Sequence, residues 1–110
     1  MPRLTHPRLD DVPLENLLHA LADPARLAIV RRLEADGRGG GEGLACGGAA
    51  ACGMPRATLS NHFTILRAAG LIESRKQGVQ VINRLRRDDV DRRFPGVLDA
   101  VLAAEATPVA

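Results

Sequence analysis

Residues 54–72 read Met-Pro-Arg-Ala-Thr-Leu-Ser-Asn-His-Phe-Thr-Ile-Leu-Arg-Ala-Ala-Gly-Leu-Ile, and they carry the strongest structural signal in the chain. Leu59, Phe63 and Leu66 stand at positions i, i+4 and i+7, which is the spacing of one apolar helix face. Gly70 follows at the point where a glycine in the left-handed conformation commonly ends a helix. The pattern predicts a helix over residues 56–69.

The remaining surface of this predicted helix is polar and cationic. Its side chains are of the kinds that bond to base edges and phosphates of duplex DNA. They are Arg56, Ser60, Asn61, Thr64 and Arg67. A turn containing Gly53 leads into the helix, which is typical of the recognition helix in a helix-turn-helix.

Two strand-like runs follow the predicted helix. Residues 71–75 and 79–85 are rich in apolar and β-branched side chains, and the connection between them, residues 76–78, contains Gly78. Such a pair predicts a β-hairpin. A hairpin directly after a recognition helix is a wing.

Two further helices are predicted upstream. Residues 13–22 carry a leucine stripe at i, i+3, i+4 and i+7, formed by Leu14, Leu17, Leu18 and Leu21. Asp23 is a good N-cap and Pro24 a good first residue for the second helix. Its apolar set is Leu27, Ile29, Val30 and Leu33. We expect its three arginines to face outward or along the rim; they are Arg26, Arg31 and Arg32.

The other segments complete a single predicted domain. Glycine-rich residues 36–43 predict a flexible loop, and residues 44–52 a short helix. Asp88 or Asp89 is placed to cap a further helical turn before Pro95. Residues 95–106 predict a last helix with an apolar stripe of Val97, Leu98, Val101 and Leu102.

The predicted fold is mainly α with a β-hairpin wing: a winged helix-turn-helix in the order α-α-α-α-β-β-α. The domain is expected over residues 12–106, between a flexible arm at 1–11 and a loose tail at 107–110. A chain of 110 residues has a modest core, so a second subunit that covers more apolar surface is expected. The alternative is that the stripes on residues 14–21 and 97–102 pack within one subunit.

Composition excludes several classes of protein. Phe63 and Phe94 are the only aromatic residues, which argues against a stacking platform for single-stranded nucleic acid. No apolar run approaches the roughly 20 residues of a membrane span, and residues 1–11 lack a signal core. We therefore expect a cytoplasmic protein.

The net charge of +2 is unevenly distributed. Residues 53–93 hold nine cationic and four acidic side chains, so that segment carries +5. A concentrated positive charge is expected where phosphates bind. The alternative is an ordinary solvated arginine-rich surface, and for Arg86 and Arg87 a solvated strand end is the preferred interpretation.

Two motifs resemble the ArsR/SmtB family of bacterial repressors. Residues 21–33, Leu-Ala-Asp-Pro-Ala-Arg-Leu-Ala-Ile-Val-Arg-Arg-Leu, resemble its opening signature. Residues 58–72 resemble its recognition helix and the run into the wing, and the likeness extends over residues 14–102. The resemblance implies a homodimer formed by the first and last helices, binding to a palindromic operator, repression, and release by an inducer. It places DNA contacts at Arg56, Ala57, Ser60 and Asn61.

The residues and the resemblance together give a set of predicted DNA contacts. Arg56 suits a guanine or a phosphate, and Asn61 suits an adenine. His62 suits either a phosphate or a structural bond to neighbouring backbone. The wing-tip residues suit phosphates or the minor groove. The whole set is Arg56, Ala57, Thr58, Ser60, Asn61, His62, Thr64, Arg67, Arg75, Lys76, Gln77 and Gln80.

A sensory site is harder to place. Metal sensors of the family use cysteine pairs or Asp/His sets on the last helix, but this chain has no Cys-x-Cys and no histidine after His62. Cys46 and Cys52 are its only thiols, and six residues of regular helix would leave them about 120° apart. Three alternatives stay open: buried small residues, a reversible disulfide, or a soft-metal site completed by the partner subunit. No resident cofactor or metal is expected.

The predicted function is sequence-specific transcriptional regulation by a DNA-binding repressor that an inducer or a redox change releases. The alternative from another class is a winged helix that binds protein without reading DNA. DNA binding that collapses with rising salt would separate these two. An enzyme is not expected, because the chain offers no convincing pairing of a nucleophile with a base.

Overall fold

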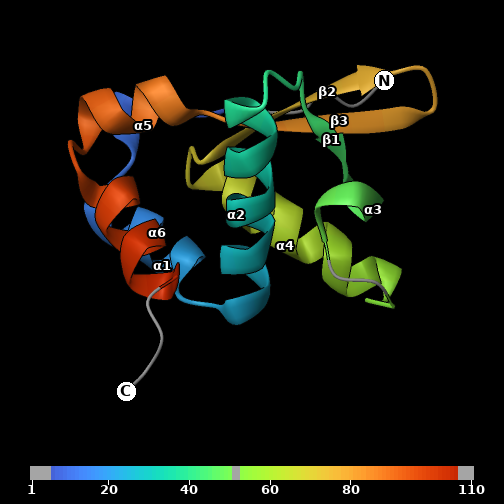
Figure 1. The fold of residues 1–110 in the computed structure, drawn as a ribbon, viewed down its shortest axis with the longest axis horizontal. Coiled ribbons are helices and arrows are strands. Elements are labelled where there is room, and N and C mark those ends of the chain that lie inside the picture. The colour runs from blue at the N-terminus through green and yellow to red at the C-terminus, as the bar shows by residue number, and fades with distance from the viewer. Residues whose placement is uncertain (1–5, 51–52, 107–110) are drawn as a thin grey trace.

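The computed structural model describes residues 6–50 and 53–106 (Figure 1). A single turn of 3₁₀ helix, η1, precedes the regular elements. In chain order the elements are η1 (Leu9–Asp11), α1 (Leu14–Leu21), α2 (Pro24–Arg38), β1 (Leu44–Ala45), α3 (Cys46–Ala49), α4 (Arg56–Ala68), β2 (Ile72–Gln77), β3 (Gln80–Leu85), α5 (Arg87–Arg93) and α6 (Val97–Ala106). The prediction of a mainly helical winged helix-turn-helix is confirmed.

The wing is a β-hairpin that projects away from α5 and α6 (Figure 1). β2 and β3 pair antiparallel from Ile72–Leu85 to Gln77–Gln80, so the connecting turn is Gly78-Val79 rather than the predicted 76–78. Gly78 has φ +63°, a conformation that side chains disfavour and that two-residue hairpin turns require. The register brings Ser74 opposite Asn83 on the inner face of the hairpin.

The hydrophobic core joins the helices to the base of the wing. Its members come from η1, from the helices α1 to α6, and from the base of the hairpin. The largest fully buried ones are Leu9, Leu17, Ile29, Val30, Leu33, Phe63, Leu66, Leu71, Ile72, Val90 and Leu98. The fold buries most of the apolar faces predicted for the second and recognition helices, but of the stripe predicted for the first helix it buries only Leu17 and Leu21 and leaves Leu14 and Leu18 exposed.

Local sequence signals set the ends of two helices. The Asp23 carboxylate accepts the Arg26 backbone N–H at 3.0 Å, as an N-cap does, and this bond is the main cause that lowers the pKa of Asp23. Gly70 has φ +77° and ends α4 in a Schellman motif, with Gly70 N–H bonded to Arg67 O and Leu71 N–H to Leu66 O. Both predictions are confirmed.

The middle of the chain differs from the prediction. α2 continues to Arg38, into the expected loop. Leu44 and Ala45 form a short strand instead of helix, because they pair with Asn83 and Ile82 on the free edge of β3. Of the described residues 44–50, those from 46 to 49 are helical. Near the end of the chain, Arg86 occupies the N-cap of α5, and Asp88 and Asp89 lie in its first turn.

Residues 6–12 also differ from the expected flexible arm. Leu9 and Val12 are only 2% and 3% exposed, in the core. Arg86 donates to Pro7 O at 2.8 Å and Arg93 to Leu9 O at 3.2 Å, so α5 holds this segment through its carbonyl groups. Because Leu9 has apolar neighbours and the carbonyls have donors, the segment gains more from packing than from remaining in water. Residues 1–5 and 107–110 lie outside the described residues.

His6 ties the same segment to the wing and makes stability depend on pH. Its Nε2 accepts the Ser74 N–H at 2.9 Å. Partial burial, helped by the charges of Arg86 and Arg67 and opposed by Glu73, lowers the pKa of His6. A lowered folded-state pKa means that the stabilisation is complete above the ordinary histidine pKa of about 6.5 and is lost as pH falls through the folded-state value.

We therefore expect the free energy of unfolding to decrease on acidification from about pH 8 to about pH 5, and to decrease less in His6→Ala. Denaturant unfolding at a series of pH values measures the free energy of unfolding of the wild-type protein and of His6→Ala, and the two pH dependences are compared. Identical pH dependence in the two would show that the bond to Ser74 contributes nothing.

Within residues 6–50 and 53–106, no helix has both the length and the apolar character that a membrane span requires.

Candidate nucleic-acid interface

α4 has one buried and one exposed face. Phe63 and Leu66 are 1% and 0% exposed and point into the core, and Leu59 packs against it. The other face is exposed; its residues are Arg56, Ala57, Thr58, Ser60, Asn61 and Thr64. The Thr64 hydroxyl donates to Ser60 O at 2.9 Å, while the other polar side chains of this face extend from the first two turns of the helix. In a helix-turn-helix, the residues at this N-terminal end of the recognition helix contact the base edges in the major groove.

The wing lies beside this face. In Figure 1 the N-terminal end of α4 and the tip of the β2–β3 hairpin point toward the same side of the molecule. The polar residues predicted for the wing tip are all exposed: Arg75, Lys76, Gln77 and Gln80. Arg75 also donates to Glu42 O at 3.1 Å, which ties the hairpin to the loop before β1. The exposed face of α4 and the exposed tip of the hairpin, residues 75–80, are together called the two-armed surface.

Two of the predicted contact residues are half-buried and contact side chains of other elements of the protein. Arg67 is half-buried, and its Nε donates to Ser74 Oγ at 3.0 Å. Ser74 Oγ in turn donates to Asn83 Oδ1 at 2.7 Å. These bonds join the end of the recognition helix to the base of the wing. The second residue is His62, which is half-buried and has its Nδ1 3.3 Å from Arg26 Nη1.

Arg26 lies inside the protein, and the prediction that it faces outward or along the rim is wrong. It is 8% exposed, because it stands one turn before Ile29 and Val30 on the buried face of α2. Its charge is tolerated there since its Nε donates to Ala20 O at 2.6 Å and its Nη2 to His19 O at 3.3 Å. These carbonyls belong to the last turn of α1, where a helix no longer supplies N–H partners for all of its carbonyls, although His19 O also accepts the Ala22 N–H at 3.1 Å. Arg31 and Arg32 are exposed as predicted.

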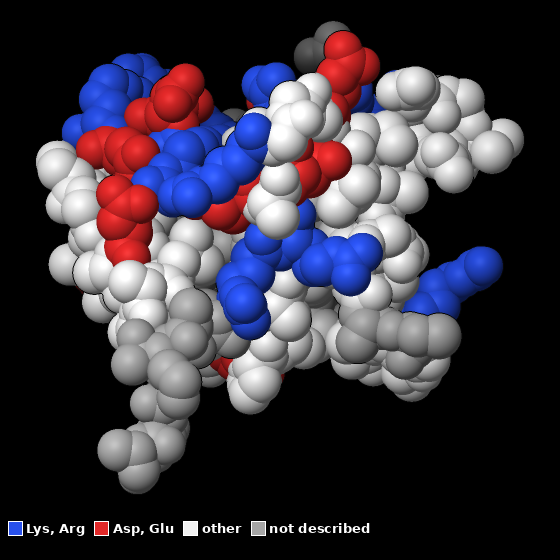
Figure 2. Space-filling model, in the orientation of Figure 1, with Lys and Arg blue, Asp and Glu red and all other residues white. Residues whose placement is uncertain are grey.

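Much of the charge on residues 53–93 lies away from the two-armed surface. Figure 2 shows cationic and acidic side chains intermingled over α5 and the C-terminal end of α2. Arg84 pairs with Glu73 at 2.9 Å, and Arg86 pairs with Asp89 at 3.3 Å. Arg92 lies within 4 Å of both Asp10 and Asp89. The segment charge of +5 therefore overstates the positive charge that α4 and the wing present.

Arg87 is the centre of this ion-paired region. It bonds to Glu34 of α2 at 2.7 Å, to Asp91 of α5 at 2.9 Å and to Asp99 of α6. Burial opposes its charge, but the bonds to Asp99 and Asp91 outweigh burial and raise its pKa. The solvated strand end preferred for Arg86 and Arg87 is thus wrong, because both side chains link separate parts of the fold.

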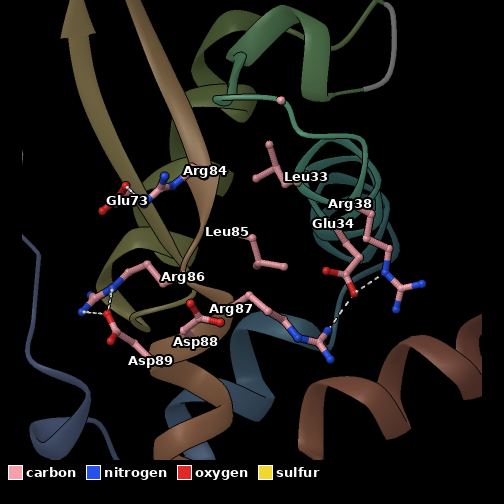
Figure 3. Close-up of a pocket in the computed structure, with 12 residues that line it drawn as sticks. Leu33, Glu34, Arg38, Glu73, Arg84, Leu85, Arg86, Arg87, Asp88 and Asp89 are labelled. Carbon is pink, nitrogen blue, oxygen red and sulfur yellow. Dashed lines mark hydrogen bonds and ion pairs between the residues drawn. The ribbon is translucent and has the colours of Figure 1, made fainter.

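A polar hollow of about 580 Å³ opens between α2, β3 and α5 (Figure 3). Leu33 and Leu85 form part of its wall, and Arg87 points across it to Glu34. Each of its four arginines is ion-paired; these are Arg38, Arg84, Arg86 and Arg87. The hollow joins elements of the fold and is separate from the exposed face of α4.

The cysteine predictions concern Cys46, since Cys52 lies outside the described residues. Cys46 is half-buried, and Asn83 Nδ2 lies 3.3 Å from its Sγ. The same amide donates to Leu44 O at 3.2 Å. In the described part of the chain, no three His, Cys, Asp or Glu side chains are grouped so as to hold a metal ion. The disulfide and soft-metal alternatives at Cys46 and Cys52 stay predictions.

Sequence reasoning missed the buried polar residues behind the surface: Arg26, Ser74 and Asn83. A signal existed for each of them. Arg26 has helical spacing with Ile29, Val30 and Leu33. Asn83 lies two residues before Leu85 and shares the inner face of β3 with it. In the same way, Ser74 lies two residues after Ile72 and shares the inner face of β2 with it. A polar residue at an apolar position of a regular pattern indicates a buried hydrogen bond.

A helix with an exposed polar face, followed by a projecting hairpin, defines a winged helix-turn-helix of the class that binds duplex DNA. A family model described as a helix-turn-helix domain matches residues 21–75. The HTH-type transcriptional regulator YceK of Bacillus subtilis (strain 168) is 34% identical over 99 residues, which cover 89% of this chain and 95% of YceK.

Solved structures agree with this class. The transcriptional repressor BigR from Xylella fastidiosa matches with a TM-score of 0.62 and 25% identity, over 86% of this chain and 88% of BigR. An ArsR family transcriptional regulator matches in fold with a TM-score of 0.61 and 19% identity, over 96% of this chain and 100% of its own. The chain belongs to the family of helix-turn-helix transcriptional regulators, and it has the winged helix-turn-helix fold of the ArsR family structure. Its function is DNA-binding transcriptional regulation, since the helix-turn-helix model matches half of the chain and the matched relatives are transcriptional regulators.

Proposed function

We propose that two copies of this chain form a dimer that binds a palindromic operator and represses transcription of the genes behind it. The exposed polar face of α4 carries this proposal. Because this face begins at the helix N-terminus, its side chains can meet base edges when the helix enters the major groove. BigR, which has the same fold, is a transcriptional repressor. Such a regulator acts on the chromosome, so we expect it in the cytoplasm.

Individual contacts follow from the chemistry of this face. We assign Arg56 to a guanine or a phosphate, Asn61 to an adenine and Ser60 to a base or phosphate oxygen. Ala57, Thr58 and Thr64 line the same face and set how closely it approaches the groove. Arg67 instead supports the wing, because its guanidinium is bonded to Ser74.

The first and last helices supply the dimer face. Leu14 and Leu18, one turn apart on α1, are 42% and 44% exposed. Val97, Val101 and Leu102 of α6 are only partly buried against the core. A second copy would remove these apolar side chains from water and place two recognition helices on successive turns of DNA.

A titration of the purified protein with DNA from its own promoter region tests the proposal. Binding should be specific and should weaken steeply with salt. As the alternative to release from DNA by an inducer, we propose that a redox change or a soft metal at Cys46 and Cys52 releases the protein from DNA. The same titration with reduced, oxidised and metal-loaded protein tests this alternative. Affinity that does not distinguish the promoter DNA from unrelated DNA would contradict the proposed operator binding.

The proposed contacts of the wing with phosphates predict a change in the salt dependence of DNA binding. If Arg75 and Lys76 contact phosphates, replacing either with alanine should lower the slope of log K against log salt by about one per protomer. Arg84→Ala is the matched control, because Arg84 lies on the wing but is paired with Glu73. Salt titrations of DNA affinity measure all three. A slope that is unchanged in Arg75→Ala or Lys76→Ala removes that residue from the interface.

A further inference from the structure

His62 lies at the edge of the face that α4 presents to DNA. It stands between exposed Asn61 and buried Phe63, and one turn after exposed Thr58. Its side chain is half-buried, with Nδ1 turned toward Arg26 Nη1 at 3.3 Å. The chemistry of this partner bears on which of the two ring nitrogens carries a proton.

A guanidinium has five N–H donors, no acceptor, and a positive charge that it keeps at any physiological pH. The nitrogen that faces Arg26 must therefore accept, and an accepting ring nitrogen carries no proton. A neutral imidazole whose Nδ1 is bare carries its proton on Nε2. The contact thus selects the Nε2–H form of His62.

Arg26 is held firmly enough to impose this selection. Its Nε and Nη2 are bonded to Ala20 O and His19 O at the end of α1, and its own backbone N–H is bonded to the Asp23 side chain. The guanidinium is buried and cannot turn to follow a different tautomer without giving up its 2.6 Å bond to Ala20 O. It also connects α1, which carries the proposed dimer face, directly to the recognition helix.

We propose that Arg26 is a positioning residue that fixes His62 as the Nε2–H tautomer, so that the recognition helix presents a neutral hydrogen-bond donor to a DNA backbone phosphate. This inference rests on the proposed operator binding. A neutral donor binds a phosphate oxygen without displacing a counterion in the way that a cation does. The contribution of His62 should therefore appear in affinity and not in the salt slope.

The tautomer can be measured without DNA. In protein labelled with ¹⁵N in its histidine rings, at about pH 8, where an ordinary imidazole is neutral, His62 should show a bare Nδ1 and a protonated Nε2. In Arg26→Met both neutral tautomers should appear, whereas Arg32→Met, the same change at an exposed position of α2, should leave the wild-type form. A protonated Nδ1 in the wild-type protein would overturn the proposal.

Two substitutions of His62 separate the roles of its two ring nitrogens. The amide of His62→Gln reaches about as far as Nε2 and can still donate outward, whereas that of His62→Asn reaches only about as far as Nδ1. We expect His62→Gln to keep affinity within about threefold of wild type and His62→Asn to lose about tenfold per protomer. The salt slope should stay unchanged in both. Equal affinity of His62→Asn and wild type, or a slope reduced by about one, would contradict a neutral donor.

Coupling between the two residues completes the test. Arg26→Met should weaken DNA binding in the wild-type background but not further in His62→Asn, because the donor it positions is then absent. Thermal unfolding of each variant shows whether the protein tested is folded. If Arg26→Met lowered DNA affinity by the same factor in the wild-type and His62→Asn backgrounds, Arg26 would support only the fold and would not position His62. If the wild-type protein does not bind its promoter DNA, the operator proposal fails, while the tautomer measurement still tests the role of Arg26.

Discussion

A protein carrying Leu14→Glu and Leu18→Glu is expected to be monomeric and to bind operator DNA about 10²- to 10⁴-fold more weakly than wild type. Leu14 and Leu18 are the apolar side chains of α1 that the fold leaves in water. A carboxylate at either position would be buried without a partner in the proposed dimer, which is strongly unfavourable. The affinity loss follows because the second half-site contact is no longer intramolecular once the subunits separate.

The fold itself should survive these two changes, since both side chains are exposed in the monomer. Asn16→Glu is the matched control: it adds a carboxylate to the same helix, at an exposed position on its far side. Sedimentation measures the assembly, and anisotropy with the operator measures the affinity. A double variant that still sediments as a dimer would place the subunit contact elsewhere on the molecule.

Replacing Asn61 with alanine is expected to cost about 1–3 kcal/mol of operator binding per protomer, or roughly 5- to 150-fold. The reason is that an amide pairs with adenine through two hydrogen bonds, and alanine leaves the base edge without either of them. The loss of affinity should occur only with operators that keep the base pair that Asn61 contacts. At that position the variant should therefore discriminate poorly between bases.

The exposed location of Asn61 makes this a test of recognition rather than of folding. Asn16→Ala removes the same side chain from an exposed position on α1 and should bind DNA as wild type does. Competition titrations with operators changed one base pair at a time measure the effect. Uniform weakening on every sequence would reassign Asn61 from a base to the phosphate backbone.

The elements that the sequence predicted well are those whose ends depend on near neighbours. The cap of α2 at Asp23 and the stop of α4 at Gly70 each involve residues only a few positions apart. The apolar spacing of Leu59, Phe63 and Leu66 likewise selects the buried face of α4 from within the helix itself. Its exposed face, which carries half of the predicted DNA contacts, follows from the same periodicity.

The elements that were missed depend on partners far along the chain. β1 is a strand because Leu44 and Ala45 meet the free edge of β3, and no propensity within residues 44–52 indicates this. The segment around Leu9 is ordered because Arg86 and Arg93 bind its carbonyls. The ion pairs of Arg87 likewise join α2, α5 and α6, whose relative positions no local pattern specifies.

By itself, the sequence determined the class of protein, the recognition helix and the side that the helix turns outward, because periodicity and capping act over one or two turns. The helical spacing of Arg26 places it on the buried face of α2, but tertiary structure alone decided that its guanidinium lies against the end of α1 and touches His62. A charged side chain can be buried only where other elements supply its hydrogen-bond partners, and those partners exist only once α1, α2 and α4 have packed together.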